Sequence, residues 1–277
     1  MKTLLIGPIH EEAHQLLKQH TELTEVSVED FPNNQFPEIE AVVLRTYTEL
    51  KDLSNLPNLK YVVSCSVGVN NLDLDLLKQK NIELIHCPGT NSNSVAEHTL
   101  HLILSLLRRK IPFPELKGKT VGIVGFGHIG KIVAKKLKGF ECNIIAFDVI
   151  EQDPEVLKEL NTTIKSMEEV AKESDIITIH VPLNKYTHHL INEEFFGNMK
   201  PNSFFINTSR EEIIDEDALI KHKDKFRDIG LDVFSENIKT NLPGALLTYH
   251  VAAQGEESFK RMCLEPVEKF LQLSKHT

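Results

Sequence analysis

The chain has 277 residues, of which 41% are hydrophobic and 26% charged, and its formal net charge is −9 at pH 7. The length suits two domains of moderate size, and the composition is that of an ordinary globular protein. The acidic balance, with no prominent basic run, argues against a protein that binds nucleic acid or an anionic membrane surface.

The cysteines and the first apolar run indicate the cellular compartment of the protein. The cysteines are scattered, with neither a C-x-x-C pair nor a spacing typical of metal ligands, which predicts reduced thiols and no metal site. The apolar run at 4–6 is cut off by Gly7 and Pro8, so it is too short for a signal-peptide core or a membrane span. We therefore expect a cytoplasmic protein with no membrane partner.

The first third of the chain alternates short apolar runs with amphipathic segments, a pattern typical of a parallel α/β fold. The predicted strands of this part are 3–6, 41–44, 61–64 and 83–86. Helical spacing of apolar residues predicts helices at 11–20 and 72–79. These elements predict one α/β unit.

A long helix and two prolines mark the boundary of that unit. The helix is predicted at 95–109, with Ser94 as its N-cap and Glu97 completing a capping box. Glu97 is more simply interpreted as this capping residue than as a catalytic acid. Pro112 and Pro114 then break the helix before a new βαβ series begins.

The second series predicts a larger α/β unit with a helix at 129–137. Its predicted strands are 120–124, 143–147, 176–180, 203–207, 229–232 and 245–248. A last helix at 256–273 follows the final strand and is expected to return to the first unit. We therefore expect one domain from 1–92 and 254–277, and a second from 93–253.

A glycine-rich turn follows the strand at 120–124 directly. Gly125 permits a tight turn, Gly127 lets the backbone approach a pyrophosphate, and Gly130 allows the next helix to pack closely on the strand. Asp148 ends the following strand, where an acidic residue hydrogen-bonds the adenosine ribose and repels a 2′-phosphate. This context favours NAD over NADP, and over a glycine turn that holds no ligand.

Six segments resemble landmarks of the D-isomer-specific 2-hydroxyacid dehydrogenases, and the resemblance runs from Arg45 to the last helix. The segments are SVGVNNLD at 66–73, NSNSVAE at 91–97, GFGHIG at 125–130, NTSR at 207–210, LDVF at 231–234 and LTYHVA at 247–252. The resemblance implies a Rossmann NAD-binding domain and a smaller flavodoxin-like substrate domain built from both chain ends. The active site would lie in the cleft between them.

The resemblance also implies reversible hydride transfer between NAD(H) and C2 of a small D-2-hydroxy acid or 2-oxo acid. A proton donor near neutral pH is required, which His250 supplies, and a permanent cation, which Arg210 supplies. The implied cofactor-binding residues are Gly125, Gly127, His128, Ile129, Gly130, Asp148, His180, Val181, Pro182, Thr187, Thr208, Ser209 and Asp232. The implied substrate-binding residues are Arg45, Ser66, Val67 and Gly68.

The chain departs from the family pattern beside the histidine. The family's glutamate, which pairs with that histidine, falls at Asn237, with Glu236 one residue before it. We assign Asn237 to the catalytic set, and a loop shift that brings Glu236 to His250 stays open. Glu211 and Tyr249 replace the usual glycine and proline, so an unusual substrate preference is expected.

Two further expectations concern assembly and function class. The connection at 109–116 is shorter than in most relatives, whose longer segment helps to build a homodimer; a homodimer is still expected by resemblance. The departures at Asn237, Glu211 and Tyr249 motivate an alternative, an NAD-responsive binding protein without catalysis. Because NAD binding needs neither Arg210 nor His250, their presence favours the enzyme.

Overall fold

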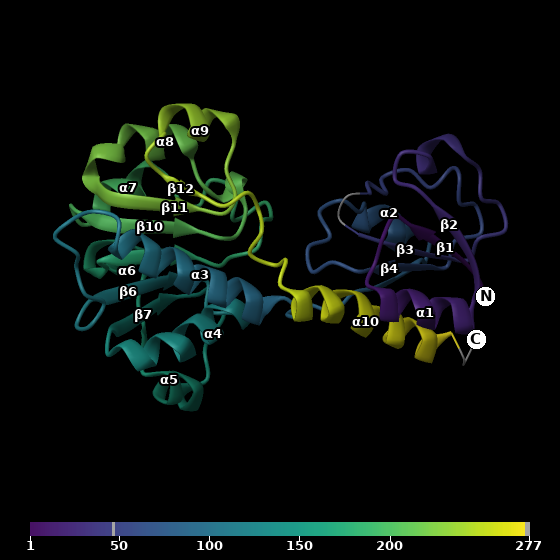
Figure 1. Ribbon diagram of the computed structural model, residues 1–277, viewed down its shortest axis with the longest axis horizontal. Helices are drawn as coiled ribbons and strands as arrows, with labels where there is room; N and C mark the ends of the chain where they lie inside the picture. The colour runs from purple at the N-terminus through teal and green to yellow at the C-terminus, as the bar shows by residue number, and fades with distance from the viewer. Residues whose placement is uncertain (46–47, 275–277) are drawn as a thin grey trace. The chain divides into compact units, whose positions relative to one another are not determined.

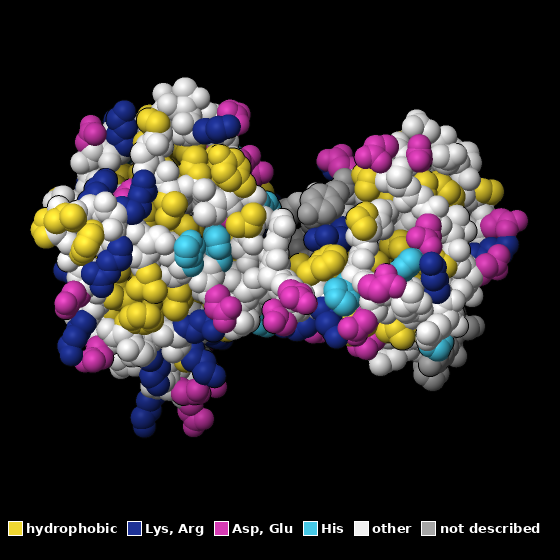
Figure 2. All heavy atoms as spheres, viewed as in Figure 1, with side chains coloured by type: hydrophobic (Ala, Val, Ile, Leu, Met, Phe, Trp, Pro, Cys, Tyr) yellow, Lys and Arg dark blue, Asp and Glu magenta, His cyan; other side chains and the backbone are white. Residues whose placement is uncertain are grey.

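The computed structural model describes residues 1–45 and 48–274 of the chain (Figure 1). The chain divides into two compact units, one formed by Met1–Asn91 together with Gln254–Thr277, the other by Ser92–Ala253. Among the helices in the described ranges, none combines the length and the apolar character needed to cross a membrane. Acidic and basic side chains are interspersed over the visible faces of both units (Figure 2).

The first unit is built on a five-stranded parallel sheet in the order β2-β1-β3-β4-β5. Its strands are β1 (Lys2–Ile6), β2 (Glu22–Val26), β3 (Ala41–Leu44), β4 (Tyr61–Ser64) and β5 (Glu83–Ile85). Its helices are α1 (Glu11–His20), η1 (Phe31–Asn33), α2 (Leu74–Gln79) and α10 (Glu256–Leu273). The helix α10 packs beside α1 and against β4, so the two ends of the chain share one core (Figure 1).

Neighbouring residues of each strand in this sheet enter different cores, because successive side chains point to opposite faces. Val43 and Val63 pack with Phe270 of α10 on one face. Val42 and Val62 pack with the other core cluster. Burial on both faces explains why the sequence of β3 and β4 is almost continuously apolar.

The second unit has a seven-stranded parallel sheet in the order β12-β11-β10-β9-β6-β7-β8. Its strands are β6 (Thr120–Val124), β7 (Asn143–Phe147), β8 (Thr162–Ile164), β9 (Ile176–Ile179), β10 (Ser203–Asn207), β11 (Phe226–Leu231) and β12 (Leu246–Leu247). Its helices are α3 (Ser92–Leu107), α4 (His128–Leu137), η2 (Lys138–Phe140), α5 (Pro154–Leu160), α6 (Met167–Glu173), α7 (Glu193–Asn198), η3 (Glu211–Ile213), α8 (Glu216–Lys221), η4 (Lys223–Lys225) and α9 (Glu236–Asn241).

The strand order of this sheet predicts where a ligand binds. The first strand, β6, lies inside the sheet, and the chain proceeds to β7 and β8 on one side before β9 to β12 extend the other. In such doubly wound sheets, ligands bind at the carboxyl ends of the strands where the order reverses, here between β6 and β9. The glycine loop follows β6 at this edge.

Short polar residues begin most helices of the second unit, which fixes the loops between sheet and helix. Each of these N-caps accepts a hydrogen bond from a backbone N–H of the first helical turn, which satisfies a group left free by the helix. The caps are Asp153, Ser166, Asn192, Asp215 and Ser235.

The expected elements differ from the observed ones in three instructive places. Strands β2 and β8 were not predicted, because β2 is largely exposed and β8 consists mostly of threonine. The predicted capping box at Ser94 is wrong: α3 begins at Ser92, and the Ser94 hydroxyl donates to the backbone oxygen of Ala252 at 2.7 Å. Glu97 instead pairs with Lys136 at 2.9 Å.

Candidate active site

The glycine loop after β6 has the shape that its residue types require. Gly125 has φ +95°, and a Cβ there would lie 2.7 Å from the backbone carbonyl carbon of His180. A Cβ at Gly130 would lie 2.2 Å from the oxygen of Gly125. At Gly127, by contrast, no atom lies within 4 Å of the added Cβ. Two glycines are therefore required by the fold itself, and the third borders open space.

The space beside Gly127 is open and lies at the start of a helix. Gly127 is the N-cap of α4 and has no side chain, so it leaves the first N–H groups of the helix to a ligand. His128 and Ile129 begin the helix there, and the helix dipole favours an anion. These residues could therefore hold an anionic group such as a pyrophosphate.

Asp148 ties the end of β7 to this loop. Its Oδ2 accepts from the backbone N–H of Phe126 at 2.6 Å, and its Oδ1 accepts from that of Ile150 at 2.8 Å. The carboxylate is thereby fixed beside the glycine loop, where a negative charge opposes a 2′-phosphate on a bound ribose. This geometry suits NAD.

The segment after β9 borders the same edge of the sheet. Nε2 of the His180 ring and the hydroxyl of Thr178 share a hydrogen bond of 3.0 Å. Burial lowers the pKa of His180 to about 3, so its imidazole is neutral near pH 7. Farther along, the hydroxyl of Thr187 donates to the oxygen of Pro182 at 2.6 Å and fixes the loop. The segment is therefore a neutral, fixed surface that could line a cofactor without adding charge.

The loop after β10 is tied to its surroundings on both sides. The hydroxyl of Thr208 lies 3.2 Å from that of Thr99 on α3, and Ser209 donates its hydroxyl to the oxygen of Val181. The side chain of Asn207 donates to the backbone oxygen of Arg210 at 2.9 Å. The loops after β9 and β10 therefore form one connected surface.

Arg210 leaves this surface as a largely desolvated cation. Its Nη1 donates to the backbone oxygen of Ser209 at 2.7 Å, which holds the guanidinium close to the backbone of the loop. Burial lowers the pKa of Arg210, and Glu212 opposes that shift. Because the ordinary pKa of arginine is so high, the group stays charged at neutral pH.

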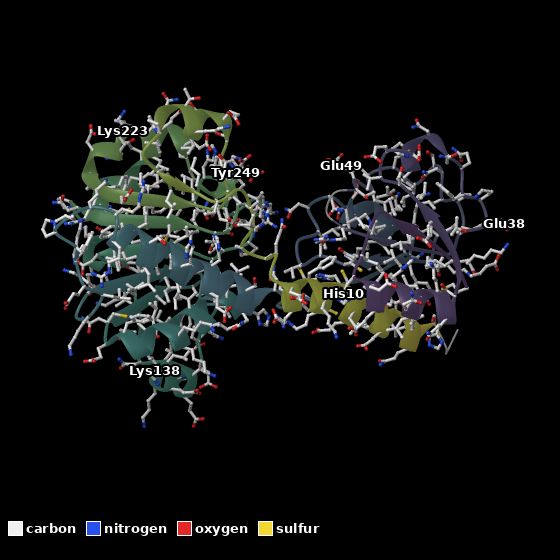
Figure 3. All side chains as sticks on the ribbon, viewed as in Figure 1. His10, Glu38, Glu49, Lys138, Lys223 and Tyr249 are labelled. Carbon is white, nitrogen blue, oxygen red and sulfur yellow. The ribbon has the colours of Figure 1, made fainter. Side chains whose placement is uncertain are left out.

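His250 lies in a tight turn after β12. Tyr249 and His250 have φ +32° and +57°, in a region that residues with a Cβ rarely adopt. The backbone N–H of His250 donates to the oxygen of Asp232 at 2.5 Å. The exposed ring of Tyr249, labelled in Figure 3, meets the ring of Phe234 edge-on at 5.2 Å. A proline at 249 could not adopt this turn, because its ring fixes φ near −65°.

The buried carboxylate of Asp232 holds this turn from inside. Its Oδ1 accepts from the hydroxyl of Thr248 at 2.7 Å and from the N–H of Val251 at 3.0 Å, and its Oδ2 accepts from the N–H of Ala252 at 3.0 Å. Desolvation raises the pKa of Asp232, but the hydrogen bonds from His98, Thr248 and the backbone outweigh it, so the pKa is lowered overall. Asp232 is therefore an ionised anchor.

Arg210, Asp232 and His250 interact at the carboxyl ends of three neighbouring strands. Desolvation is the largest cause that lowers the pKa of His250, and the Arg210 cation lowers it further. The Asp232 carboxylate acts in the opposite direction. The second unit thus brings a cation, an imidazole and a buried carboxylate to the edge of the sheet that also carries the glycine loop.

The residues expected to pair with the imidazole lie on α9. Asn237 is exposed, and its side-chain oxygen accepts from the amide of Asn241 at 2.8 Å. Glu236 is exposed and pairs with Lys239 at 3.2 Å. Whether either residue partners His250 stays a prediction. The structure adds His98 and Thr248 to the site, and only the place of Thr248 directly before Tyr249-His250 could have indicated it from sequence.

The remaining candidate residues belong to the first unit. The guanidinium carbon of Arg45 lies 4.7 Å from the ring centroid of Phe259, within range of a cation–π interaction. After β4, Ser66 is buried and Val67 and Gly68 are partly exposed. Within residues 1–45 and 48–274, no group of three or more His, Cys, Asp or Glu side chains is placed to hold a metal ion.

Comparison with known proteins decides the family. Residues 92–252 match the family model described as D-isomer specific 2-hydroxyacid dehydrogenase, NAD binding domain. The chain belongs to this family. As a member of it, the chain is an NAD-dependent oxidoreductase, and the second unit is its NAD-binding domain. The predictions of the family, the α/β fold and the cofactor are confirmed.

Individual relatives extend this finding along the whole chain. A hydroxypyruvate reductase of Thermotoga maritima is 33% identical over 95% of this chain and 94% of the relative. A glyoxylate reductase of Thermofilum pendens is 36% identical over 74% of this chain and 69% of the relative. The structure resembles a D-lactate dehydrogenase from Aquifex aeolicus, complexed with NAD and lactic acid, with a TM-score of 0.85 and 29% identity over 99% of this chain and 96% of that one. These relatives favour the enzyme over the non-catalytic binding protein.

Proposed function

We propose that this 2-hydroxyacid dehydrogenase works as a reductase of a small 2-oxo acid, with Arg210 and His250 as its catalytic residues. The observation that carries the assignment is their placement: Arg210 and His250 follow β10 and β12, on either side of β11, at the edge of the sheet that holds the glycine loop. They are close enough for the Arg210 cation to lower the pKa of His250. Both groups carry chemistry that dinucleotide binding does not need. A cation beside an imidazole suits the polarisation and protonation of a carbonyl oxygen.

The residues have separate roles in this reaction. Bound NADH supplies the hydride that is added to C2 of the oxo acid. Arg210 binds the carbonyl and carboxylate oxygens and stabilises the negative charge that develops on the carbonyl oxygen. Protonated His250 donates the proton that turns this oxygen into a hydroxyl group and becomes neutral itself. In the reverse direction, neutral His250 accepts that proton.

The cofactor-binding residues lie in five loops of the second unit, which follow β6, β7, β9, β10 and β11. The glycine loop and the start of α4 bind the pyrophosphate, and Asp148 binds the adenosine ribose. The loops after β9 and β10 line the nicotinamide half with His180, Val181, Pro182, Thr187, Thr208 and Ser209. Asp232 is assigned to the nicotinamide carboxamide, but its side chain is fully buried, so the carboxamide reaches Oδ2 only if the turn around Ala252 moves aside.

The first unit, Met1–Asn91 with Gln254–Thr277, is the substrate domain in this proposal and supplies substrate-binding groups. The backbone N–H groups after Ser66, at Val67 and Gly68, bind the substrate carboxylate, and Arg45 binds its distal end. The partial exposure of Val67 and Gly68 supports this role. The names of the relatives make glyoxylate and hydroxypyruvate the first substrates to try.

NADH oxidation against a panel of 2-oxo acids tests the proposal. Glyoxylate, hydroxypyruvate, pyruvate and longer 2-oxo acids are supplied in turn to the parent enzyme and to R210A and H250A. Turnover by the parent, reduced by about a hundredfold or more in both variants while NADH still binds, supports the assignment. NADH binding without turnover on any acid would support the non-catalytic alternative.

We propose further that the enzyme is a cytoplasmic homodimer. Support for the compartment comes from Cys65, Cys87, Cys142 and Cys263, which are all free thiols. Support for a dimer comes from the exposed apolar side chains of Ile111 and Phe113 after α3. Sedimentation of the full chain gives the oligomeric state, and I111S with F113S is expected to shift it to monomer; a monomeric parent would reject the dimer.

A further inference from the structure

Asp232, at the neighbouring strand end, holds the turn that carries His250 through both its backbone and its side chain. The backbone oxygen of Asp232 accepts from His250, and the carboxylate accepts from residues on both sides of it, Thr248, Val251 and Ala252. The turn contains two residues with positive φ, which is unfavourable for side chains with a Cβ. Its shape therefore depends on these hydrogen bonds.

The direction of the hydrogen bonds around Thr248 follows from the charge of Asp232. An ionised carboxylate only accepts, so the single hydroxyl proton of Thr248 points to Oδ1 of Asp232 at 2.7 Å. The oxygen of Thr248 is then left to accept from His98, whose Nε2 lies 2.8 Å away. The same nitrogen lies 3.4 Å from Oδ1 of Asp232. His98 therefore carries its proton on Nε2. It donates to the oxygen of Thr248, and the hydroxyl of Thr248 donates to the carboxylate of Asp232.

His98 is well placed to fix this arrangement, because it belongs to a long helix of the core. The helix α3 packs against α4, β10 and β11. It reaches the His250 turn a second time through Ser94, whose hydroxyl donates to the oxygen of Ala252 at 2.7 Å. The neighbouring residue Thr99 contacts Thr208 in the loop that leads to Arg210. One face of α3 therefore contacts both loops that carry the proposed catalytic residues.

We propose that His98 is a positioning residue of the reaction, which acts through Thr248 and Asp232 on His250. This inference rests on the proposed function of His250. Thr248 and Asp232 keep the turn in its strained shape. His98 in turn fixes the positions of Thr248 and Asp232 relative to that turn. The imidazole of His250 is thereby held at a fixed distance from Arg210 and Asp232.

The proposal has a consequence for the pH dependence of the reaction. The charged groups that act on His250 are Arg210, which lowers its pKa, and Asp232, which raises it; desolvation also lowers it. If Asp232 moves away from the turn, the stabilisation of protonated His250 weakens. Reduction requires the protonated form, so the basic limb of the pH profile of kcat/KM for the oxo acid moves to lower pH.

Matched variants on α3 test the role of His98 in the full-length enzyme. H98L removes the donor, H98Q retains an N–H donor, and H101L changes an exposed histidine one turn farther along, whose ring centroid lies 5.7 Å from that of His98. H98L is expected to reduce kcat about tenfold, as for the loss of one hydrogen bond at a catalytic group, with KM for NADH unchanged. The basic limb moves to lower pH in H98L, and H98Q restores both quantities. H101L matches the parent.

A second pair covers the case in which H98L does not fold. T248V removes the hydroxyl with little change of volume, and T248S retains it; the same loss of kcat and the same shift of the limb are expected in T248V alone. If H98L has the kcat of the parent enzyme and the same basic limb of the pH profile, the positioning role is wrong. If H98L does not fold, the same result in T248V overturns it. If H250A also retains activity, the proposed function itself fails; if only H250A loses activity, that function stands without His98.

Discussion

The glycine loop after β6 and the His250 turn after β12 lie at the same edge of one sheet, yet their shapes have different origins. Gly125 adopts φ +95°, which glycine reaches without a steric penalty. Tyr249 and His250 also have positive φ, but they carry full side chains. Their shape is held by hydrogen bonds from distant residues. The loop that faces the cofactor is therefore encoded locally, and the turn that carries the acid–base group is imposed by its surroundings.

The largest effect is expected from removal of the anchor of the His250 turn. D232N places an amide nitrogen among donors that need an acceptor, so the turn is expected to shift and kcat to fall about a hundredfold. Steady-state NADH oxidation measures the change. The control is D228N, which alters a buried carboxylate of the same strand that pairs with Arg109; it is expected to lower stability with little change of kcat. If D232N has the kcat of the parent enzyme, the turn keeps its shape without the Asp232 carboxylate.

The second effect concerns the locally encoded loop. G125A forces a Cβ against the backbone of His180 and strains the dihedral, so the free energy of unfolding is expected to fall by about 2 kcal/mol or more. Urea denaturation followed by fluorescence or circular dichroism measures it. G118A is the control, because Gly118 has φ +72° with no atom within 4 Å of an added Cβ. Its expected loss of about 1 kcal/mol is that of the dihedral alone. Equal losses in both variants would contradict the close approach of His180.

A smaller effect separates binding from folding within the same loop. G127A adds a methyl group in open space, so stability is unchanged, but that methyl group occupies the place proposed for the pyrophosphate. NADH affinity is expected to fall about tenfold, as measured by quenching or enhancement of NADH fluorescence. G139A, which also adds a methyl group in open space, is expected to leave affinity at the parent value. Parent affinity in G127A would exclude this loop as the pyrophosphate site.

The smallest effect concerns Asn237, which is exposed on α9 and bonded to Asn241. N237E introduces a carboxylate at the sequence position where the family pattern has a glutamate. It is expected to raise the basic limb of the pH profile by a few tenths of a unit, since a solvated charge acts weakly. N241D is the control, because it places a carboxylate one turn farther along α9. An unchanged limb in N237E would remove Asn237 from the site.

Strands and helices with regular apolar spacing were predictable, and weakly patterned ones were not. The bounds of β3, β4, β6, β7, β10 and α10 agree with the expected ranges, because each has a clear apolar run or a helical repeat. The edge strand β2 and the threonine-rich β8 lack such a pattern. The sequence pattern puts the start of α3 two residues too late, because serine at 94 is typical of an N-cap. In the structure Ser94 lies inside the helix, and its hydroxyl donates to the oxygen of Ala252.

By itself, the sequence determined the order of the α/β elements, the family and the choice of NAD. These features depend on residue types at short spacing: glycines where the backbone must turn, and an acid at the end of the next strand. Only the tertiary structure decided what holds His250. His98 and Thr248 are 150 positions apart in the chain, and Asp232 and Ala252 are 20 apart. Hydrogen bonds over such separations leave no local pattern, because the fold alone brings the partners together.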